Sequence, residues 1–168
     1  FSQYNVKSSP IDLSGIFNRS FRDDGKAPGW TGQGPEMDLC ALKTGKHNFH
    51  SIRINTVDPD DNGGRSCLVL GQELGPEKAG LKITDFPKGS RYLYLLHASA
   101  WTPPTLLPVG TIVIRYADGT TEKQTVAAGR DCGNWYKPTN GPNAFPAWTG
   151  KVPSADTGLY LSAFPLKG

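Results

Sequence analysis

The chain has 168 residues, including 20 glycines and 14 prolines, and a formal net charge of +3. This length suits one domain and is sufficient to bury a core. The charge is small and both signs are interspersed, so the sequence does not predict nucleic-acid binding. No apolar run approaches the ~20 residues of a transmembrane helix, so we expect no membrane span.

The sequence begins at Phe1 and contains a single methionine. We therefore interpret residues 1–168 as one domain from a longer protein, with any signal peptide already absent. Its cysteines, Cys40, Cys67 and Cys132, are odd in number and widely spaced, which matches neither a disulfide framework nor a zinc motif. Three buried free thiols is the interpretation we favour, and one disulfide with one free thiol is the alternative.

Helix signals are weak along the whole chain, whereas strand signals are numerous. Short runs of β-branched and aromatic residues between Gly- and Pro-rich turns occupy residues 48–57, 66–70, 81–86, 92–100, 111–116, 121–126 and 158–164. The clearest hairpin joins residues 111–116 and 121–126 around an Asp-Gly turn. The almost wholly apolar run 92–100 predicts a central strand covered on both faces. Together these patterns predict an all-β fold, an antiparallel β-sandwich of jelly-roll type.

Three of the four tryptophans, Trp101, Trp135 and Trp148, fall at or near the ends of these runs, beside turn residues. An indole ring buries well, but it also offers a flat apolar face against which the C–H groups of a sugar can stack. We predict that Trp135 and its neighbour Tyr136, in the loop-like segment GNWYKP, provide such a face, with Trp101 as a lesser candidate. The alternative is that these rings belong to the core of the sandwich.

Polar groups suited to sugar hydroxyls accompany Trp135. Arg130, Asp131 and Asn134 bring a guanidinium, a carboxylate and an amide to the same loop, and these groups donate to and accept from hydroxyl pairs. The alternative is a structural Arg–Asp pair that holds the loop in place. His97, inside the apolar run, is a further lesser candidate for sugar contact, although we favour a core histidine with satisfied hydrogen bonds.

One segment, DPDDNGG, carries oxygen ligands of the kind that calcium prefers: Asp58, Asp60 and Asn62. The spacing does not match the EF-hand loop, which ends in a bidentate glutamate. The same residues are also ordinary turn formers, and this is the interpretation we favour. One structural calcium ion is the only cofactor that the sequence suggests.

Several longer segments, taken in order, resemble an accessory β-sandwich domain of large secreted bacterial proteins that degrade polysaccharides. They are IDLSGIFNRSF, GWTGQGPEMDL, DPDDNGGRSCLVL, RYLYLLHASAW, RYADGT, GRDCGNWY and AWTG. The resemblance implies a galactose-binding-like jelly roll that acts as a non-catalytic carbohydrate-binding module. Its partners would be a polysaccharide or oligosaccharide and the catalytic domain of a parent glycoside hydrolase or polysaccharide lyase. The location would be secreted, cell-surface or periplasmic.

Two alternatives stay open. The first is a structural sandwich that packs against a catalytic domain without binding sugar. The second is a small polysaccharide-active enzyme. Glycosidases need two carboxylates about 5–10 Å apart across a cleft, and no glutamate of this chain lies in an apolar run that would raise its pKa. GxSxG, Walker and GxGxxG motifs are absent. A Ser–His–Asp triad that includes His97 is not excluded, but nothing indicates one, so we expect a protein without catalytic activity.

Overall fold

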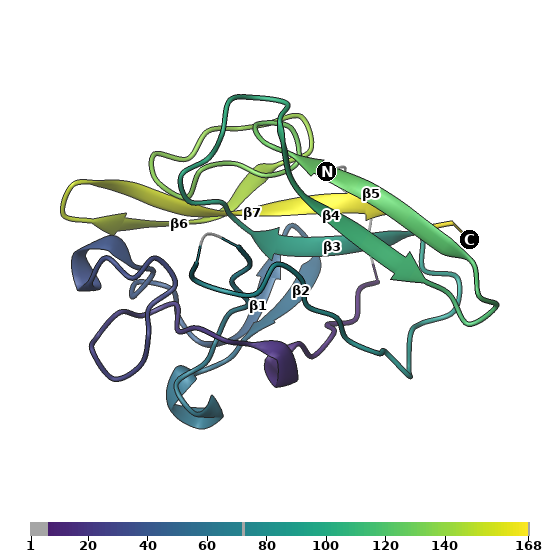
Figure 1. Cartoon of the computed structure of the whole chain (residues 1–168), viewed down its shortest axis with the longest axis horizontal. Helices are drawn as coiled ribbons and strands as arrows, with labels where there is room; N and C mark the ends of the chain where they lie inside the picture. The colour runs from purple at the N-terminus through teal and green to yellow at the C-terminus, as the bar shows by residue number, and fades with distance from the viewer. Residues whose placement is uncertain (1–6, 72, 168) are drawn as a thin grey trace. The chain divides into compact units, whose positions relative to one another are not determined.

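The computed structural model describes residues 7–71 and 73–167. Within them the chain forms seven β-strands and three short 3-10 helices (Figure 1). The paired strands are antiparallel, so the predicted β-rich, antiparallel fold is confirmed. The chain packs as two compact units, residues 1–86 with 150–154 and residues 87–149 with 155–168. None of the helices in the described part of the chain has the length and apolar character needed to span a lipid bilayer.

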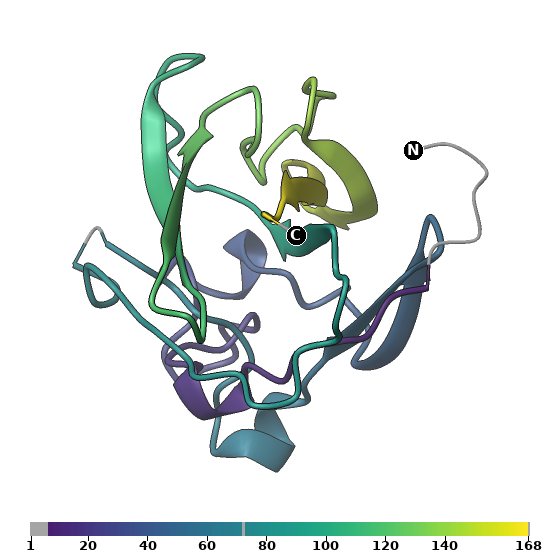
Figure 2. The same ribbon diagram turned by 90° about the vertical axis from the view of Figure 1, so that its right-hand side faces the viewer.

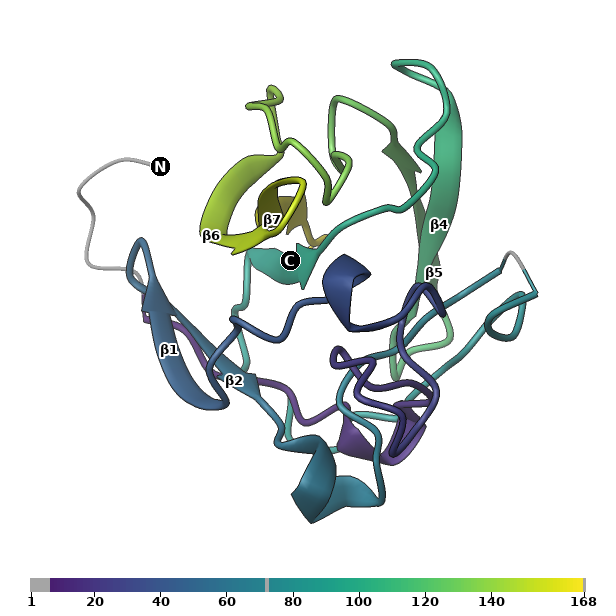
Figure 3. The ribbon, with the colours of Figure 1, turned by 90° about the vertical axis from the view of Figure 1, so that its left-hand side faces the viewer.

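The first unit contains the 3-10 helices η1 (Ser14–Ile16), η2 (Pro35–Met37) and η3 (Pro59–Asn62) and the strands β1 (Gly45–Phe49) and β2 (Ile52–Thr56). β1 and β2 form a two-stranded ribbon (Figure 3). The prediction of one strand over residues 48–57 is therefore wrong. The chain reverses at His50 and Ser51, whose φ angles are 50° and 69°. This left-handed turn usually carries Asn-Gly, so the sequence lacks the signal that would have revealed it.

Two further predicted strands of this unit do not form. In the segment 66–70, only Cys67 makes an isolated bridge, with Arg19. Within the described residues, the segment 81–86 pairs with no other strand. Its apolar side chains are exposed, with Leu81 at 42% and Phe86 at 39%. Alternation along a segment shows which side chains could share a face, but it does not supply the neighbouring strand that a sheet requires.

Side-chain hydrogen bonds replace the missing ladders in this unit. The amide of Asn18 donates to the carbonyl of Val69 at 2.9 Å and accepts from its N–H at 2.8 Å. The buried carboxylate of Asp38 accepts from the N–H groups of Asp23 and Cys40. Buried backbone groups need such partners wherever no strand provides them. The apolar residues buried in this unit include Phe21, Trp30, Leu39, Leu42 and Ile52.

Most residues of the remaining strands belong to the second unit, and residues 150–154 of the β6–β7 hairpin belong to the first. These strands are β3 (Tyr92–His97), β4 (Pro108–Arg115), β5 (Thr121–Ala127), β6 (Phe145–Val152) and β7 (Ala155–Pro165). β7 lies between β3 and β6 in one sheet, and β4 pairs with β5 in a second. The predicted hairpin is confirmed at β4 and β5: Gly119 takes a φ of 86°, and Asp118 accepts from the N–H of Thr120 at 2.8 Å.

The prediction of a central strand over residues 92–100 is wrong. This run forms β3, which is an edge strand of its sheet, and Tyr92 is 50% exposed. The central strand is β7, which is buried from Thr157 to Ser162. Apolar side chains along a run indicate that other residues cover them. They do not indicate whether the strand has a neighbour on one side or on both. The core between these strands contains Val126, Cys132 and Phe164, with Leu93, Leu95 and Ile112 packed against them.

All three cysteines are free thiols in the structure. The prediction that all three are buried is wrong for Cys40, which is exposed, while Cys67 is half-buried and Cys132 is buried. Burial raises the pKa of Cys67 to about 12 and that of Cys132 to about 11. Thiols with pKa values this high stay protonated and unreactive near neutral pH.

Candidate functional site

The loop of residues 128–144, which carries most of the predicted sugar-binding residues, connects β5 to β6. Figures 2 and 3 show it between the β4–β5 ribbon and β6. Tyr160 of β7 lies beneath it, fully buried, and its hydroxyl donates to the carbonyl of Asn134 at 2.9 Å and accepts from the N–H of Thr139 at 3.1 Å. A side chain at Gly133 would collide with the Tyr160 ring, so the loop can approach β7 only with glycine there.

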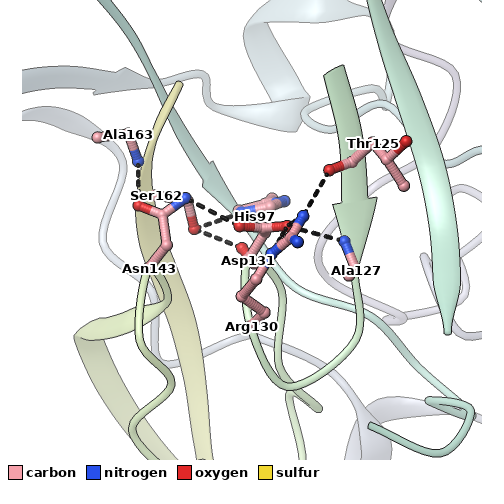
Figure 4. Close-up of polar contacts among 8 residues, drawn as sticks. All are labelled: His97, Thr125, Ala127, Arg130, Asp131, Asn143, Ser162 and Ala163. Carbon is pink, nitrogen blue, oxygen red and sulfur yellow. Dashed lines mark hydrogen bonds and ion pairs between the residues drawn. The ribbon is translucent and has the colours of Figure 1, made fainter. Parts of the chain in front are cut away.

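Asp131 is the centre of this loop (Figure 4). Its side chain is buried, and one carboxylate oxygen accepts from Arg130 at 2.6 and 2.8 Å and from the N–H of Ala127 at 2.9 Å. The other oxygen accepts from the amide of Asn143 at 3.0 Å. Burial raises the pKa of Asp131, but these hydrogen bonds outweigh it and hold the pKa below its ordinary value. Asp131 and Arg130 therefore form the structural pair that we considered as the alternative to sugar contact.

His97 joins the same network through Ser162 (Figure 4). The Ser162 hydroxyl donates to the backbone carbonyl of Asp131 at 2.6 Å, and His97 Nε2 lies 2.9 Å from the same hydroxyl. A hydroxyl has one proton to donate, and here the carbonyl takes it. His97 Nε2 must therefore carry the proton that it shares with Ser162. Burial lowers the pKa of His97 to about 4, so the ring is neutral near pH 7, as the favoured core-histidine interpretation predicts.

This arrangement brings a serine, a histidine and an aspartate together without the geometry of a catalytic triad. In a triad, the histidine accepts the serine proton and the aspartate carboxylate orients the histidine. Here the histidine donates, and Asp131 offers its backbone carbonyl to Ser162. Ser162 is also fully buried, so no substrate could reach its hydroxyl. The polar contacts among these residues hold the loop against β3 and β7.

The ring of Trp135 does not face solvent, and the prediction that it provides a stacking face is wrong. The residue is 3% exposed. The backbone N–H of Trp135 donates to the carbonyl of Ser99 at 3.0 Å, and the backbone carbonyl of Trp135 accepts from the N–H of Gly158 at 2.8 Å. Both backbone groups of Trp135 thus pair with neighbouring segments. The half-buried Tyr136 ring lies edge-on to the Trp135 ring at 5.9 Å.

Trp101 has the opposite environment. It is 55% exposed and takes a φ of 50°. Left-handed backbone is uncommon for residues other than glycine, asparagine and aspartate, and for a bulky side chain it costs about 1–2 kcal/mol. The turn that imposes this conformation is fixed by Ser99, whose hydroxyl lies 2.7 Å from that of Thr102. The fold therefore holds a large indole ring in solvent at an energetic cost.

Asn134 lies beside the segment that leads into the Trp101 turn. Ser99, two residues before Trp101, forms a bridge with Asn134, and the N–H of Ser99 donates to Gly133 at 2.9 Å. Asn134 is exposed, and its side-chain oxygen accepts from the N–H of Tyr136 at 3.3 Å. Of the predicted residues, Trp101 and Asn134 are exposed, and the segments that carry them are bridged at Ser99 and Asn134. The structure places Arg130, Asp131 and His97 in the polar network and Trp135 in the interior.

The predicted calcium ligands form a turn instead of a shared cage. Asp58 caps η3 by accepting from the N–H of Asp60 at 3.0 Å, and its other oxygen accepts from Thr44 at 3.1 Å. Asn62 donates its amide to two backbone carbonyls. Within residues 7–71 and 73–167, no group of three or more His, Cys, Asp and Glu is arranged to hold a metal ion. These contacts fit the turn interpretation, and a calcium ion at this turn stays a prediction.

Comparison of the chain with protein-family models, with curated proteins and with solved structures finds no match. The resemblance to an accessory domain of polysaccharide-degrading proteins therefore stays a prediction. Any function must be argued from the surfaces described above.

Proposed function

We propose that this protein is a non-catalytic carbohydrate-binding module, and that Trp101 is the residue against which the sugar stacks. The proposal includes the jelly-roll sandwich that the sequence predicts, a secreted, cell-surface or periplasmic location, and attachment to a glycoside hydrolase or polysaccharide lyase. Its ligand would be a polysaccharide or oligosaccharide, which the module would hold near the catalytic domain.

The observation that carries this proposal is the exposed indole of Trp101 on a left-handed backbone. Burying apolar area stabilises a protein by roughly 25 cal/mol per Å², so an exposed indole forgoes a large contribution to folding. Residues held in unfavourable backbone regions cluster at binding sites, where the surrounding structure enforces them. Both costs are understandable if the free face of the ring stacks on a ligand.

The neighbouring polar groups suit a sugar bound on this ring. The exposed amide of Asn134 can both donate to and accept from a hydroxyl pair. Thr102 follows Trp101 directly and adds a hydroxyl that already engages Ser99. A single stacking ring with few hydrogen bonds predicts a modest affinity, with Kd in the micromolar to millimolar range.

The test uses a glycan array to select the ligand, followed by calorimetric titration of the whole chain. Trp101→Ala should weaken binding at least tenfold, since it removes the stacking face. The matched control is Tyr92→Ala, which removes an aromatic ring of similar exposure, 50%, from β3. That variant should bind within twofold of the parent.

Two outcomes would contradict the proposal. One is an array on which the parent chain retains no glycan. The other is a Trp101→Ala variant that binds as tightly as the parent. Far-ultraviolet circular dichroism of both variants would show that any loss of affinity is not a loss of fold.

A second candidate function is favoured by one observation. Leu106 and Leu107, a few residues after Trp101, are 65% and 49% exposed. Exposed apolar groups next to one another are typical of surfaces that contact another protein. The module would then pack against the catalytic domain of its parent through this segment. If the two surfaces are separate, the double variant Leu106→Ser with Leu107→Ser would raise the solubility of the chain and leave sugar binding intact. Trp101→Ala would then leave the solubility unchanged.

A further inference from the structure

One face of the β1–β2 ribbon gathers cations and amides around a hollow. Residues two apart on a strand share a face, and directly paired residues on neighbouring strands share it too. Lys46 pairs with Asn55, and Asn48 pairs with Arg53. These four side chains therefore stand together on one face, as two cations and two amides at the corners of a rectangle.

The hollow on this ribbon has a volume of about 470 Å³, and its lining includes these four residues, His47 and Pro10. The hollow is open to solvent, and its four polar side chains are exposed. Pro10 reaches the ribbon because the preceding segment is tied to it: the N–H of Arg53 donates to the Ser8 hydroxyl at 2.9 Å, and the Arg53 guanidinium donates to the Ser8 carbonyl. Figures 2 and 3 show this segment running beside the ribbon.

The ribbon is locally basic in a unit that carries little net charge. Residues 43–57 include Lys43, Lys46 and Arg53 and no aspartate or glutamate. In the described part of the chain, the structure gives neither Lys46 nor Arg53 a carboxylate within ion-pair distance. A guanidinium has five N–H donors, and the Ser8 carbonyl engages one of its nitrogens. Both cations are therefore in a position to meet an anion.

We propose that this face of the β1–β2 ribbon binds a carboxylate-bearing sugar unit of an acidic polysaccharide. Lys46 and Arg53 would pair with the carboxylate, Asn48 and Asn55 would contact the neighbouring hydroxyls, and Pro10 would lie against the C–H groups of the ring. The choice of a sugar as the carrier of the carboxylate rests on the proposed function. The small net charge of the chain, +3, disfavours nucleic acid as the polyanion.

Polygalacturonate, alginate and hyaluronate serve as probes, and affinity electrophoresis in gels that contain each polymer measures binding by the whole chain. At least one of them should retard the parent chain, and the retardation should weaken as salt rises from 50 to 200 mM. Lys46→Glu should weaken binding at least tenfold. The matched control, Lys123→Glu, reverses one exposed charge on β5 and should bind within threefold of the parent. Asn48→Ala should weaken binding about threefold without any change of charge.

Four results would overturn the inference: no retardation by any of the three polymers, equal losses in Lys46→Glu and Lys123→Glu, Asn48→Ala retarded as strongly as the parent, or duplex DNA bound as tightly as the acidic polymers. Trp101→Ala separates this inference from the proposed function. If Trp101→Ala fails to weaken binding to the array-selected glycan while Lys46→Glu still abolishes retardation, the proposed role of Trp101 is wrong and the ribbon site stands. The reverse pattern leaves Trp101 as a binding residue and removes the ribbon site.

Discussion

The loop around Asp131 and the turn at Trp101 are neighbours in the second unit, yet they use a tryptophan in opposite ways. In the loop, hydrogen bonds to Ser99 and Gly158 fix the backbone on both sides of Trp135, and the ring is buried. In the turn, the backbone takes a left-handed conformation and Trp101 points into solvent. The comparison teaches that the partners of the backbone, not the residue type, decide which indole is available to a ligand.

The largest expected effect concerns the loop. Asp131→Ala removes the acceptor for Arg130, Asn143 and the N–H of Ala127. The Arg130 side chain is 46% exposed and can be hydrated, so the cost comes from the other two donors. Leaving each of them without an acceptor lowers the unfolding free energy by about 1–3 kcal/mol. Urea denaturation would measure this loss. If Asp131→Ala unfolded at the same urea concentration as the parent, the loop would not be the structural element described here.

A smaller effect concerns His97 and pH. The unfolded residue takes its ordinary pKa of 6.5, and the folded one has a pKa of about 4. Between these values the unfolded chain binds a proton that the folded chain does not. The stability contributed by neutral His97 is therefore complete above pH 6.5 and is lost as pH falls toward 4.

Between pH 7 and pH 4.5, we expect the unfolding free energy of the parent chain to fall by about 2–3 kcal/mol more than that of the His97→Gln variant. Urea denaturation at a series of pH values would show it, and groups that titrate in both proteins cancel from the difference. Parallel stability curves for the two proteins would mean that folding does not lower the pKa of His97.

The smallest effect concerns the turn. Trp101→Gly should relieve the left-handed conformation, so it should be about 1 kcal/mol more stable than Trp101→Ala. Both variants lack the ring, and thus thermal unfolding of the pair isolates the backbone. Equal melting temperatures would show that the backbone at Trp101 is not strained. Backbone strain would then no longer support a binding role for Trp101.

Local signals predicted part of the fold. The Asp-Gly turn at Asp118 and Gly119 identified the β4–β5 hairpin, because this turn chemistry is specific. The residues of the turn at His50 and Ser51 have no such preference, so the sequence predicts one strand where β1 and β2 form. The edge position of β3 is not predicted either, since strand order depends on contacts between distant segments.

The sequence identifies residues that gather near the candidate site, but it does not predict their contacts or their exposure. The sequence offers Arg130 and Asp131 as a possible structural pair, which the structure contains. The other partners of Asp131, Asn143 and Ser162, lie 12 and 31 residues from it in the sequence. No local pattern marks such contacts. For the same reason, the sequence could not distinguish the buried Trp135 from the exposed Trp101.

The exposure of the cysteines determines where a thiol-reactive dye can be attached. Of the three cysteines, Cys40 alone is exposed. The hydrogen bond to Asp38 raises the pKa of Cys40 as well, but Cys67 and Cys132 are both more covered and held protonated by burial. A maleimide dye should thus attach at one defined position, in the unit that carries the β1–β2 ribbon. Fluorescence anisotropy of that labelled chain would report its association with a large polymer directly, without any engineered attachment point.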